Sequence, residues 1–286
     1  MLSPAPQGPS CLNCGSVLSG RYCTACGQKR VDAFERSLTH QLVEFWRVST
    51  NVENRPIASL LRLLAAPGEL TRAYVVEGAR RRYMSPVALF LMTNLLFFLL
   101  PGYGLRDFSV GLPMQSLQWY GRIAQWLIDV RLASRGLSLE QYAALYEPVA
   151  DDLAKSLIIV HAPFLALVQA LLLRRSGWYY VDHLAGVLHF LAFVMVFAML
   201  LPRVVEPAWT LWTAMGLPQR EEWFESAVQA IVILALGAWL WGLLGRAYGL
   251  GWPWRPPVII ALLGSFWVIH ILLYRFTQFL LAYALS

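Results

Sequence analysis

Residues 183–202 read HLAGVLHFLAFVMVFAMLLP, a stretch of twenty residues between Asp182 and Arg203 that contains no Asp, Glu, Lys or Arg. An α-helix needs about 20 consecutive apolar residues to cross the hydrocarbon core of a bilayer. An ionisable side chain at that depth is costly, so a charge-free window of this length marks a candidate span. The stretch therefore predicts a transmembrane helix.

Four more charge-free windows cover residues 83–105, 156–173, 226–245 and 256–274. Runs such as LLFFLL at 95–100 are apolar on every face, whereas the strands of a membrane barrel alternate apolar and polar residues. The chain is 58% hydrophobic and only 14% charged, against roughly 25% charged in soluble domains. This composition excludes a soluble enzyme, a disordered chain and a disulfide-rich secreted scaffold. The sequence predicts an all-α, polytopic transmembrane bundle of about five spans.

Positive charge sets the expected orientation, because cytoplasmic flanks of spans carry the excess of Lys and Arg. With the N-terminus inside, fifteen of the 23 basic residues lie on the inner side and seven outside, with Arg275 at or just past the last span. The triplet at 80–82, directly before the first window, is the strongest signal. The first ten residues have neither the basic region nor the apolar region of a signal peptide. We expect a cytoplasmic N-terminus and a C-terminus on the far side.

All four cysteines fall within sixteen residues, as Cys11, Cys14, Cys23 and Cys26, and Gly15 and Gly27 each follow a pair. Each Cys-x2-Cys-Gly unit can form a tight knuckle, and two knuckles supply four sulfurs to a tetrahedral Zn²⁺. Four thiolates leave no open position, so the predicted site is structural. The alternatives are iron, a pair of disulfides or a redox dithiol. A reducing cytoplasm disfavours the disulfides.

The expected domain organisation is a flexible lead at 1–10, a zinc ribbon at 11–30, amphipathic interfacial helices at 31–83, and a transmembrane bundle at 84–286 with an outer helical cap at 104–152. Within the interfacial segment, Ile57, Leu60, Leu61 and Leu64 share the predicted apolar helix face. Within the cap, Ser138 and Gln141 form a capping box that opens a helix, which we expect Pro148 to end.

Polar side chains inside the windows are the candidate intramembrane site. Asp182 and His189 are seven residues apart and so lie within about 20° of one another around a helix, next to His183. His161 and His270 lie in neighbouring windows. Polar groups at this depth often mark a substrate path, a proton relay or a metal site. The alternative is a histidine that only hydrogen-bonds a carbonyl or a tyrosine, which we favour for His161 and His270 taken singly; for Asp182, His183 and His189 the two interpretations are balanced.

Three stretches share a recurring pattern. They hold Pro67-Gly68, Tyr74, Gly78, Arg80, Tyr83, Pro86 and Leu95-Leu96-Phe97-Phe98; then Tyr180-Val181-Asp182-His183 with His189-Phe190; then RAYGLGW at 246–252. The pattern resembles a family of bacterial membrane proteins of unknown function that carry an N-terminal zinc ribbon. The resemblance covers nearly the whole chain except 104–150, and it implies a bacterial inner membrane location. It implies no activity. Members usually have Glu at the position of Asp182 and often His at that of Leu191.

The leading hypothesis is a membrane component whose polar site binds or transports a small ion or a lipid headgroup, while the ribbon contacts a cytoplasmic protein partner. A second hypothesis is a lipid-modifying enzyme in which His183 or His189 is a general base oriented by Asp182. A third is a structural scaffold. No nucleotide, zincin or nucleophile-elbow motif occurs. Two or three basic ribbon residues are too few for nucleic acid, and a homo-oligomer is compatible with this composition.

Overall fold

The structure is a computed structural model that describes residues 11, 14–18, 20, 22–26, 55–78, 82–99, 110–216 and 221–286. Its contacts divide the chain into two units, Met1–Asn54 and Arg55–Ser286. The described residues of the second unit are almost entirely helical, and in the first unit Val17 and Tyr22 are isolated bridge residues. An all-α fold is therefore confirmed for the described part of the chain. Residues 31–54 of the expected interfacial segment lie outside it.

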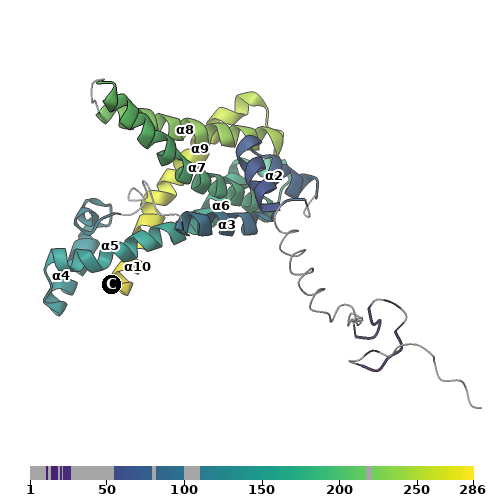
Figure 1. Cartoon of the computed structure of the whole chain (residues 1–286), viewed down its shortest axis with the longest axis horizontal. Coiled ribbons are helices and arrows are strands. Elements are labelled where there is room, and N and C mark those ends of the chain that lie inside the picture. The colour runs from purple at the N-terminus through teal and green to yellow at the C-terminus, as the bar shows by residue number, and fades with distance from the viewer. Residues whose placement is uncertain are drawn as a thin grey trace, which may run out of the picture. The chain divides into compact units, whose positions relative to one another are not determined.

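The second unit begins with a helix over residues 55–65, followed by short elements and then long helices (Figure 1). In chain order these are α2 (Glu69–Thr71), η2 (Arg72–Val76), α3 (Pro86–Leu99), η4 (Leu112–Leu117), α4 (Gly121–Arg135), α5 (Leu139–Ser156), η5 (Leu157–Val160), α6 (His161–Leu172), η6 (Arg174–Ser176), α7 (Tyr180–Ala214), α8 (Glu221–Arg246), η7 (Trp252–Trp254), α9 (Arg255–Ile269), η8 (His270–Tyr274) and α10 (Arg275–Leu285). Both η2 and η8 are π-helical turns.

Three of the described helical stretches are long and apolar enough to cross a membrane: Tyr180–Ala214, Glu222–Arg246 and Trp252–Leu285. A fourth candidate is the pair Leu139–Ala154 and Leu157–Leu172, which is bent by 56° at the break. The 14 residues of α3 span about 21 Å, less than the ~30 Å of a hydrocarbon core. The structure thus gives three spans, or four with the bent pair, and the predicted five are not confirmed.

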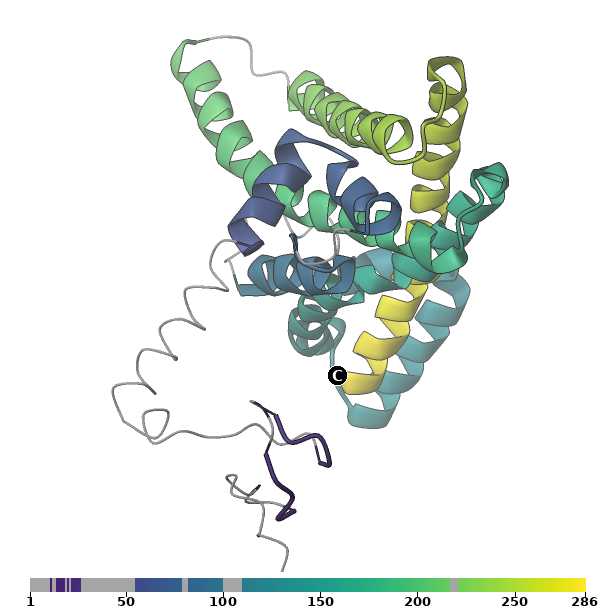
Figure 2. The ribbon, with the colours of Figure 1, turned by 90° about the vertical axis from the view of Figure 1, so that its right-hand side faces the viewer.

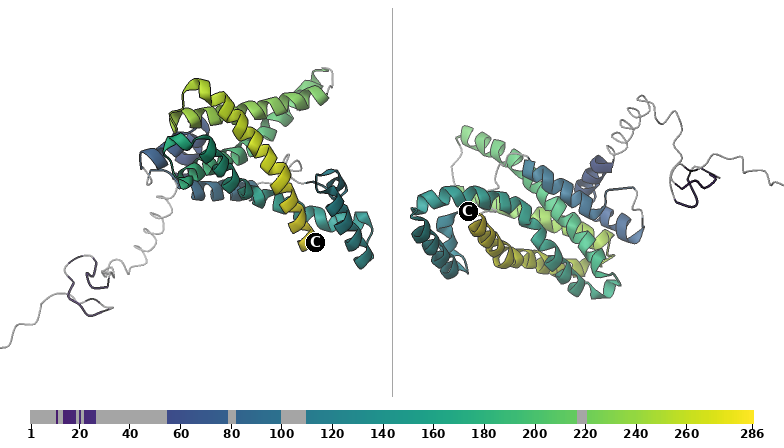
Figure 3. Two further views of the ribbon diagram at one scale, coloured as in Figure 1. Left: turned by 180° about the vertical axis from the view of Figure 1, so that it is seen from behind. Right: turned by 90° about the horizontal axis from the view of Figure 1, so that it is seen from below.

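Two ends of this unit can be distinguished, and the continuous helix α9–η8–α10 connects them (Figure 3). At the first, here called the α2 end, residues 55–78 pack against the start of α7 and the end of α8. Figure 2 shows this segment in dark blue against the two green helices. At the second, here called the α4 end, α10 packs against α5 and the cap that contains α4.

The Pro67-Gly68 turn fixes the α2 end by touching the backbone of α8 directly. Gly68 has a φ of +85°, and a Cβ atom there would lie 2.7 Å from the carbonyl oxygen of Gly242. A Cβ atom on Gly242 would lie 2.7 Å from Cβ of Pro67. The guanidinium of Arg246 donates to the carbonyl of Pro67 at 2.8 Å. Two glycines are therefore needed for this close approach.

The apolar face predicted for the helix at 55–65 is largely exposed in the structure. Ser59 and Leu63 are buried, whereas Ile57 and Leu61 are 59% and 62% exposed. The indole nitrogen of Trp239 donates to the carbonyl of Leu63 at 2.9 Å. In a bilayer the outward face is the apolar one and helix contacts favour small or polar residues, so the apolar stripe points outward.

The α4 end has its own core, built from the cap and α10. Ser138 and Gln141 form the predicted capping box. Contrary to expectation, α5 does not end at Pro148 but continues to Ser156. Tyr146 and Ala150, on either side of the proline, are buried in the same cluster as Phe279. This packing maintains the helix across one missing backbone donor.

Candidate functional site

The four cysteines come together in the first unit. All four sulfur atoms lie within 4.8 Å of one another. Sγ of Cys11 is 3.6 Å from Sγ of Cys26, and Sγ of Cys14 is 3.6 Å from Sγ of Cys23. Four ligands at about 2.3 Å around one tetrahedral ion would be about 3.8 Å apart. The sulfurs are thus within metal-binding distance, and the cysteines form no disulfide.

The first knuckle has the geometry that its sequence predicts. Gly15 has a φ of +72°, and its amide donates to the carbonyl of Cys11 at 2.9 Å. The Ser16 hydroxyl and amide lower the pKa of the Cys14 thiol to about 6, which favours the thiolate, the form that binds metal. Gly27 lies outside the described residues.

A second group of polar side chains meets inside the bundle at the α2 end. Nδ1 of His189 is 2.9 Å from the hydroxyl of Thr71, and Nδ1 of His183 is 2.9 Å from the hydroxyl of Tyr248. Gln169 of α6 joins them next to Gly186. We call Thr71, Gln169, His183, His189 and Tyr248 the His189 cluster. Four chain segments contribute to it: α2, α6, α7 and the residues after α8.

Two nitrogens of this cluster lack a protein partner. His189 and Gln169 are each 1% exposed, and Nε2 of each is buried without a hydrogen bond. In a neutral imidazole one nitrogen donates and the other accepts. The Thr71 contact at Nδ1 fixes the orientation of the ring, and Nε2 then takes whichever of the two roles Nδ1 does not. Unsatisfied polar atoms inside a membrane cost several kcal/mol each. The cluster is therefore suited to bind a small polar molecule.

Gly186 leaves room at the centre of this cluster. A Cβ atom there would lie 3.6 Å from Cγ2 of Thr71, 3.7 Å from the Tyr248 hydroxyl and 3.8 Å from Nε2 of Gln169. These are ordinary van der Waals contacts. A methyl group would therefore fit, in contact with the Tyr248 hydroxyl and Nε2 of Gln169.

Asp182 does not join His189, although the two share a helix face. Its carboxylate accepts a hydrogen bond from the amide of Tyr179 at 3.0 Å and so caps the start of α7. Seven residues of helix put His189 about 10 Å further along the axis, where it contacts Thr71 instead. The expected Asp182–His189 pair is thus replaced by two separate local roles.

His161 and His270 meet each other, not the His189 cluster. Their ring centroids are 5.5 Å apart, and Phe266 and Tyr274 extend the stack at 4.8 Å from His161 and 4.6 Å from His270. Nδ1 of His161 lies 3.2 Å from the carbonyl of Ile158, so Nδ1 carries the proton. Nε2 of His161 is buried without a partner. We call His161, Phe266, His270 and Tyr274 the His161 stack.

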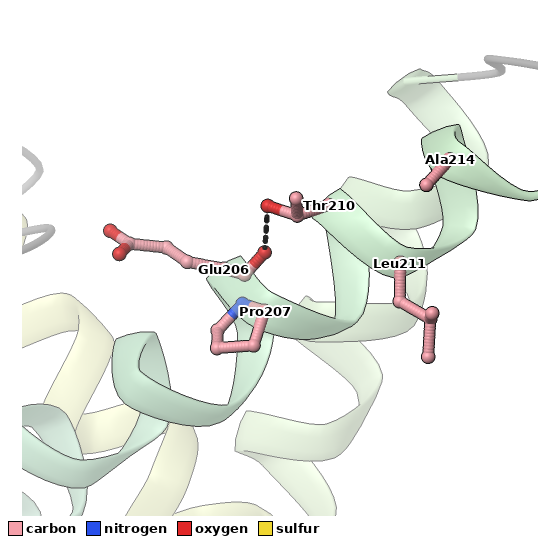
Figure 4. Close-up of a pocket in the computed structure, with 5 residues that line it drawn as sticks. All are labelled: Glu206, Pro207, Thr210, Leu211 and Ala214. Carbon is pink, nitrogen blue, oxygen red and sulfur yellow. Dashed lines mark hydrogen bonds between the residues drawn. The ribbon is translucent and has the colours of Figure 1, made fainter.

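A shallow surface groove on α7 carries no such chemistry. Figure 4 shows its lining residues, Glu206, Pro207, Thr210, Leu211 and Ala214, all from one helix. The hydroxyl of Thr210 donates to the carbonyl of Glu206 at 2.9 Å. No second element brings a polar group to this surface.

Sequence reasoning missed Thr71, Gln169 and Tyr248 as members of the site. Gln169 is a lone polar residue in a charge-free window, and Tyr248 lies in the quoted RAYGLGW stretch. Each carried a signal, but their meeting depends on how three distant segments pack.

Comparison with known proteins gives one partial match. A family model described as "Protein of unknown function (DUF3667)" matches residues 53–98. This range holds the helix at 55–65, the Pro67-Gly68 turn, Thr71 and most of α3. The comparison with curated proteins finds no match, and the comparison with solved structures finds none either.

Proposed function

We propose that this protein is an integral membrane component that binds a small polar ligand, an ion or a lipid headgroup, in the His189 cluster. The observation that carries the proposal is the pair of buried Nε2 atoms without partners, on His189 and Gln169. They lie in a bundle whose helices are apolar enough for a membrane. An intramembrane polar group of this kind is a functional-site hypothesis by default.

We also propose five crossings with the N-terminus in the cytoplasm of a bacterial inner membrane. Met84 bonds Ser59 at the α2 end, whereas Val110 accepts from Gln115 at the α4 end. Met84 and Val110, which lie on either side of α3 in the sequence, are therefore at opposite ends, and this supports a crossing that includes α3. The α2 end also carries Arg174, Arg175, Arg246 and Arg255, in line with the positive-inside rule.

The metal of the four-cysteine site is proposed to be Zn²⁺, on ligand type and sulfur spacing. Such a site would stabilise the folded ribbon, and four sulfur ligands would leave no coordination position on the zinc for a substrate. The ribbon would then be free to contact a cytoplasmic protein partner. Lipid-modifying catalysis with His189 as the base gains no support, because Asp182 caps a helix and does not orient that ring. The form of this hypothesis with His183 as the base stays a prediction.

The test compares two glycine-to-alanine changes within spans. Gly186→Ala would fill the space in the His189 cluster without a clash, and Gly264→Ala is the matched control because no atom lies within 4 Å of its new Cβ. Small molecules and lipids extracted from each purified protein are identified by mass spectrometry. We expect one species to co-purify with wild type and Gly264→Ala and to be lost in Gly186→Ala.

If both variants retain the co-purifying species equally, or if no species co-purifies with wild type, the binding proposal is wrong. The lipid composition of a deletion strain provides the second arm. A lipid that accumulates there while nothing co-purifies would favour the enzyme, and an unchanged composition would favour the scaffold.

A further inference from the structure

A second binding surface lies at the α4 end, around Arg275. This arginine begins α10, twenty residues after Arg255 on the continuous helix α9–η8–α10. Twenty residues of helix rise about 30 Å, the thickness of a hydrocarbon core. Since Arg255 lies at the α2 end, where its Nε donates to the carbonyl of Leu250, Arg275 lies at the opposite membrane boundary.

The guanidinium of Arg275 is poorly satisfied by the protein. Its Nε is buried without a hydrogen-bond partner, and NH1 makes one long bond of 3.3 Å to the side-chain oxygen of Gln118. No carboxylate of the described residues forms an ion pair with it. A guanidinium offers five donors in a planar fork that matches phosphate oxygens. Its unused donors call for an anionic partner.

The surroundings of Arg275 indicate a partner with an apolar tail. On the turn below it, Ile271 and Leu272 are each 44% exposed. Trp119 from the cap is 55% exposed, packs on Phe276 at 5.3 Å between ring centroids, and donates its indole hydrogen to the carbonyl of Ile271. An exposed tryptophan at a membrane boundary marks the headgroup level. The apolar residues then face acyl chains.

We infer that Arg275, with Gln118 and Trp119, binds the phosphate of an anionic phospholipid from the leaflet at the α4 end. Arg275 supplies the charge, Gln118 orients the guanidinium, and Ile271 and Leu272 contact the upper acyl chains. This surface shares no residue with the His189 cluster. It does not depend on which leaflet faces the cytoplasm.

The test measures lipid binding to the full chain by native mass spectrometry, with phosphatidylglycerol as the probe and phosphatidylcholine as the zwitterionic comparison. We expect phosphatidylglycerol to bind wild type more tightly than phosphatidylcholine, and Arg275→Gln to weaken it by about tenfold through loss of charge-assisted hydrogen bonds. Arg122→Gln removes an exposed charge on α4 and is the matched control. It should leave binding unchanged.

Three outcomes would overturn the inference: equal losses in the two variants, no preference for phosphatidylglycerol in wild type, or its displacement by inorganic phosphate, which would indicate a site for free anions. If Arg275→Gln does not fold, Arg275→Lys is measured instead, because it keeps the positive charge without the planar fork of donors. We expect it to bind phosphatidylglycerol with intermediate affinity. Unchanged binding would show that the guanidinium is not needed. The two results stay separate, because this inference is read from the difference between Arg275→Gln and Arg122→Gln, whereas the proposed function is read from the difference between Gly186→Ala and Gly264→Ala.

Discussion

The two pairs of histidines in the bundle are both buried, yet their surroundings differ in kind. His189 and His183 each bond a hydroxyl from another segment, Thr71 and Tyr248. His161 and His270 lie instead in a stack of near-parallel rings, and His161 bonds a carbonyl only three residues away. A ring held by a distant hydroxyl presents its second nitrogen in a set direction, whereas a stacked ring can be replaced by a carbon ring. The first arrangement also brings Gln169 and Tyr248 together beside Gly186, and it is the one that we propose as the ligand site.

We expect the largest effect from a change that separates residues 55–78 from α8, because that segment carries Thr71, the partner of His189. Gly242→Ala would place a methyl group 2.7 Å from Cβ of Pro67 and 2.9 Å from its carbonyl oxygen. Such overpacking against backbone costs about 1–3 kcal/mol, and we expect the upper part of this range. The measurement is thermal unfolding in detergent, with hydrogen exchange of residues 55–78.

Gly264→Ala is the control for the general effect of an added methyl group in a span, because the new Cβ meets no atom. Exchange should quicken at the α2 end and remain slow at the α4 end. A Gly242→Ala protein as stable as Gly264→Ala would show that the Pro67-Gly68 turn does not rest on α8.

The next prediction compares one change in each pair. His189→Phe leaves the Thr71 hydroxyl without its partner, which costs about 1–2 kcal/mol. His161→Phe preserves the ring stack and removes a buried Nε2 that has no partner. It also removes the Nδ1 bond to the carbonyl of Ile158, but that carbonyl still accepts from the His161 amide. Its effect is therefore within about 0.5 kcal/mol of zero. The free energies of unfolding of the two variants, measured under the same conditions, test this prediction. A larger loss for His161→Phe would reverse the roles assigned to the two pairs.

Some of this arrangement could be predicted from the sequence. The charge-free windows gave the long helices α7, α8 and α9–α10, because hydrophobic length is a local property. The four cysteines and Gly15 gave a cluster of sulfurs, because their geometry spans only sixteen residues. Both properties depend only on residues that are close together in the sequence.

The His189 cluster could not be predicted in the same way. Thr71 and His189 are 118 residues apart, and what joins them is the contact of the Pro67-Gly68 turn with Gly242. Helical spacing alone suggested Asp182 as the partner of His189, since both lie on one face of α7. The spacing correctly places the two residues at nearly the same angle around the helix. It does not take account of the rise along the axis, which puts Asp182 and His189 about 10 Å apart.

A smaller effect tests this corrected pairing. Thr71→Val and His189→Phe should be coupled by about 1 kcal/mol in a double-mutant cycle, because each removes the same hydrogen bond. Asp182→Asn and His189→Phe should instead add within about 0.5 kcal/mol, because the carboxylate and the imidazole have different partners. Unfolding free energies of the single and double variants provide both values. Coupling between Asp182 and His189 would restore the dyad and with it the enzyme hypothesis.

The smallest effect on the bundle is expected from the metal site, which lies in the other unit of the chain. Cys23→Ser removes one of four sulfurs that lie within 4.8 Å of one another. Because a structural zinc site needs all four ligands closed around the ion, the metal content should fall from about one zinc per chain to near zero. The unfolding temperature of residues 55–286 should not change, since the buried core described for this unit is built from its own residues. Ser16→Ala is the control, because it keeps every sulfur and alters only the hydroxyl beside Cys14. Metal analysis of the purified proteins and a thermal scan of each give the two readouts.

Full zinc occupancy in Cys23→Ser would contradict the four-cysteine site. Loss of bundle stability together with zinc would contradict the expectation that the two units are stable independently of each other.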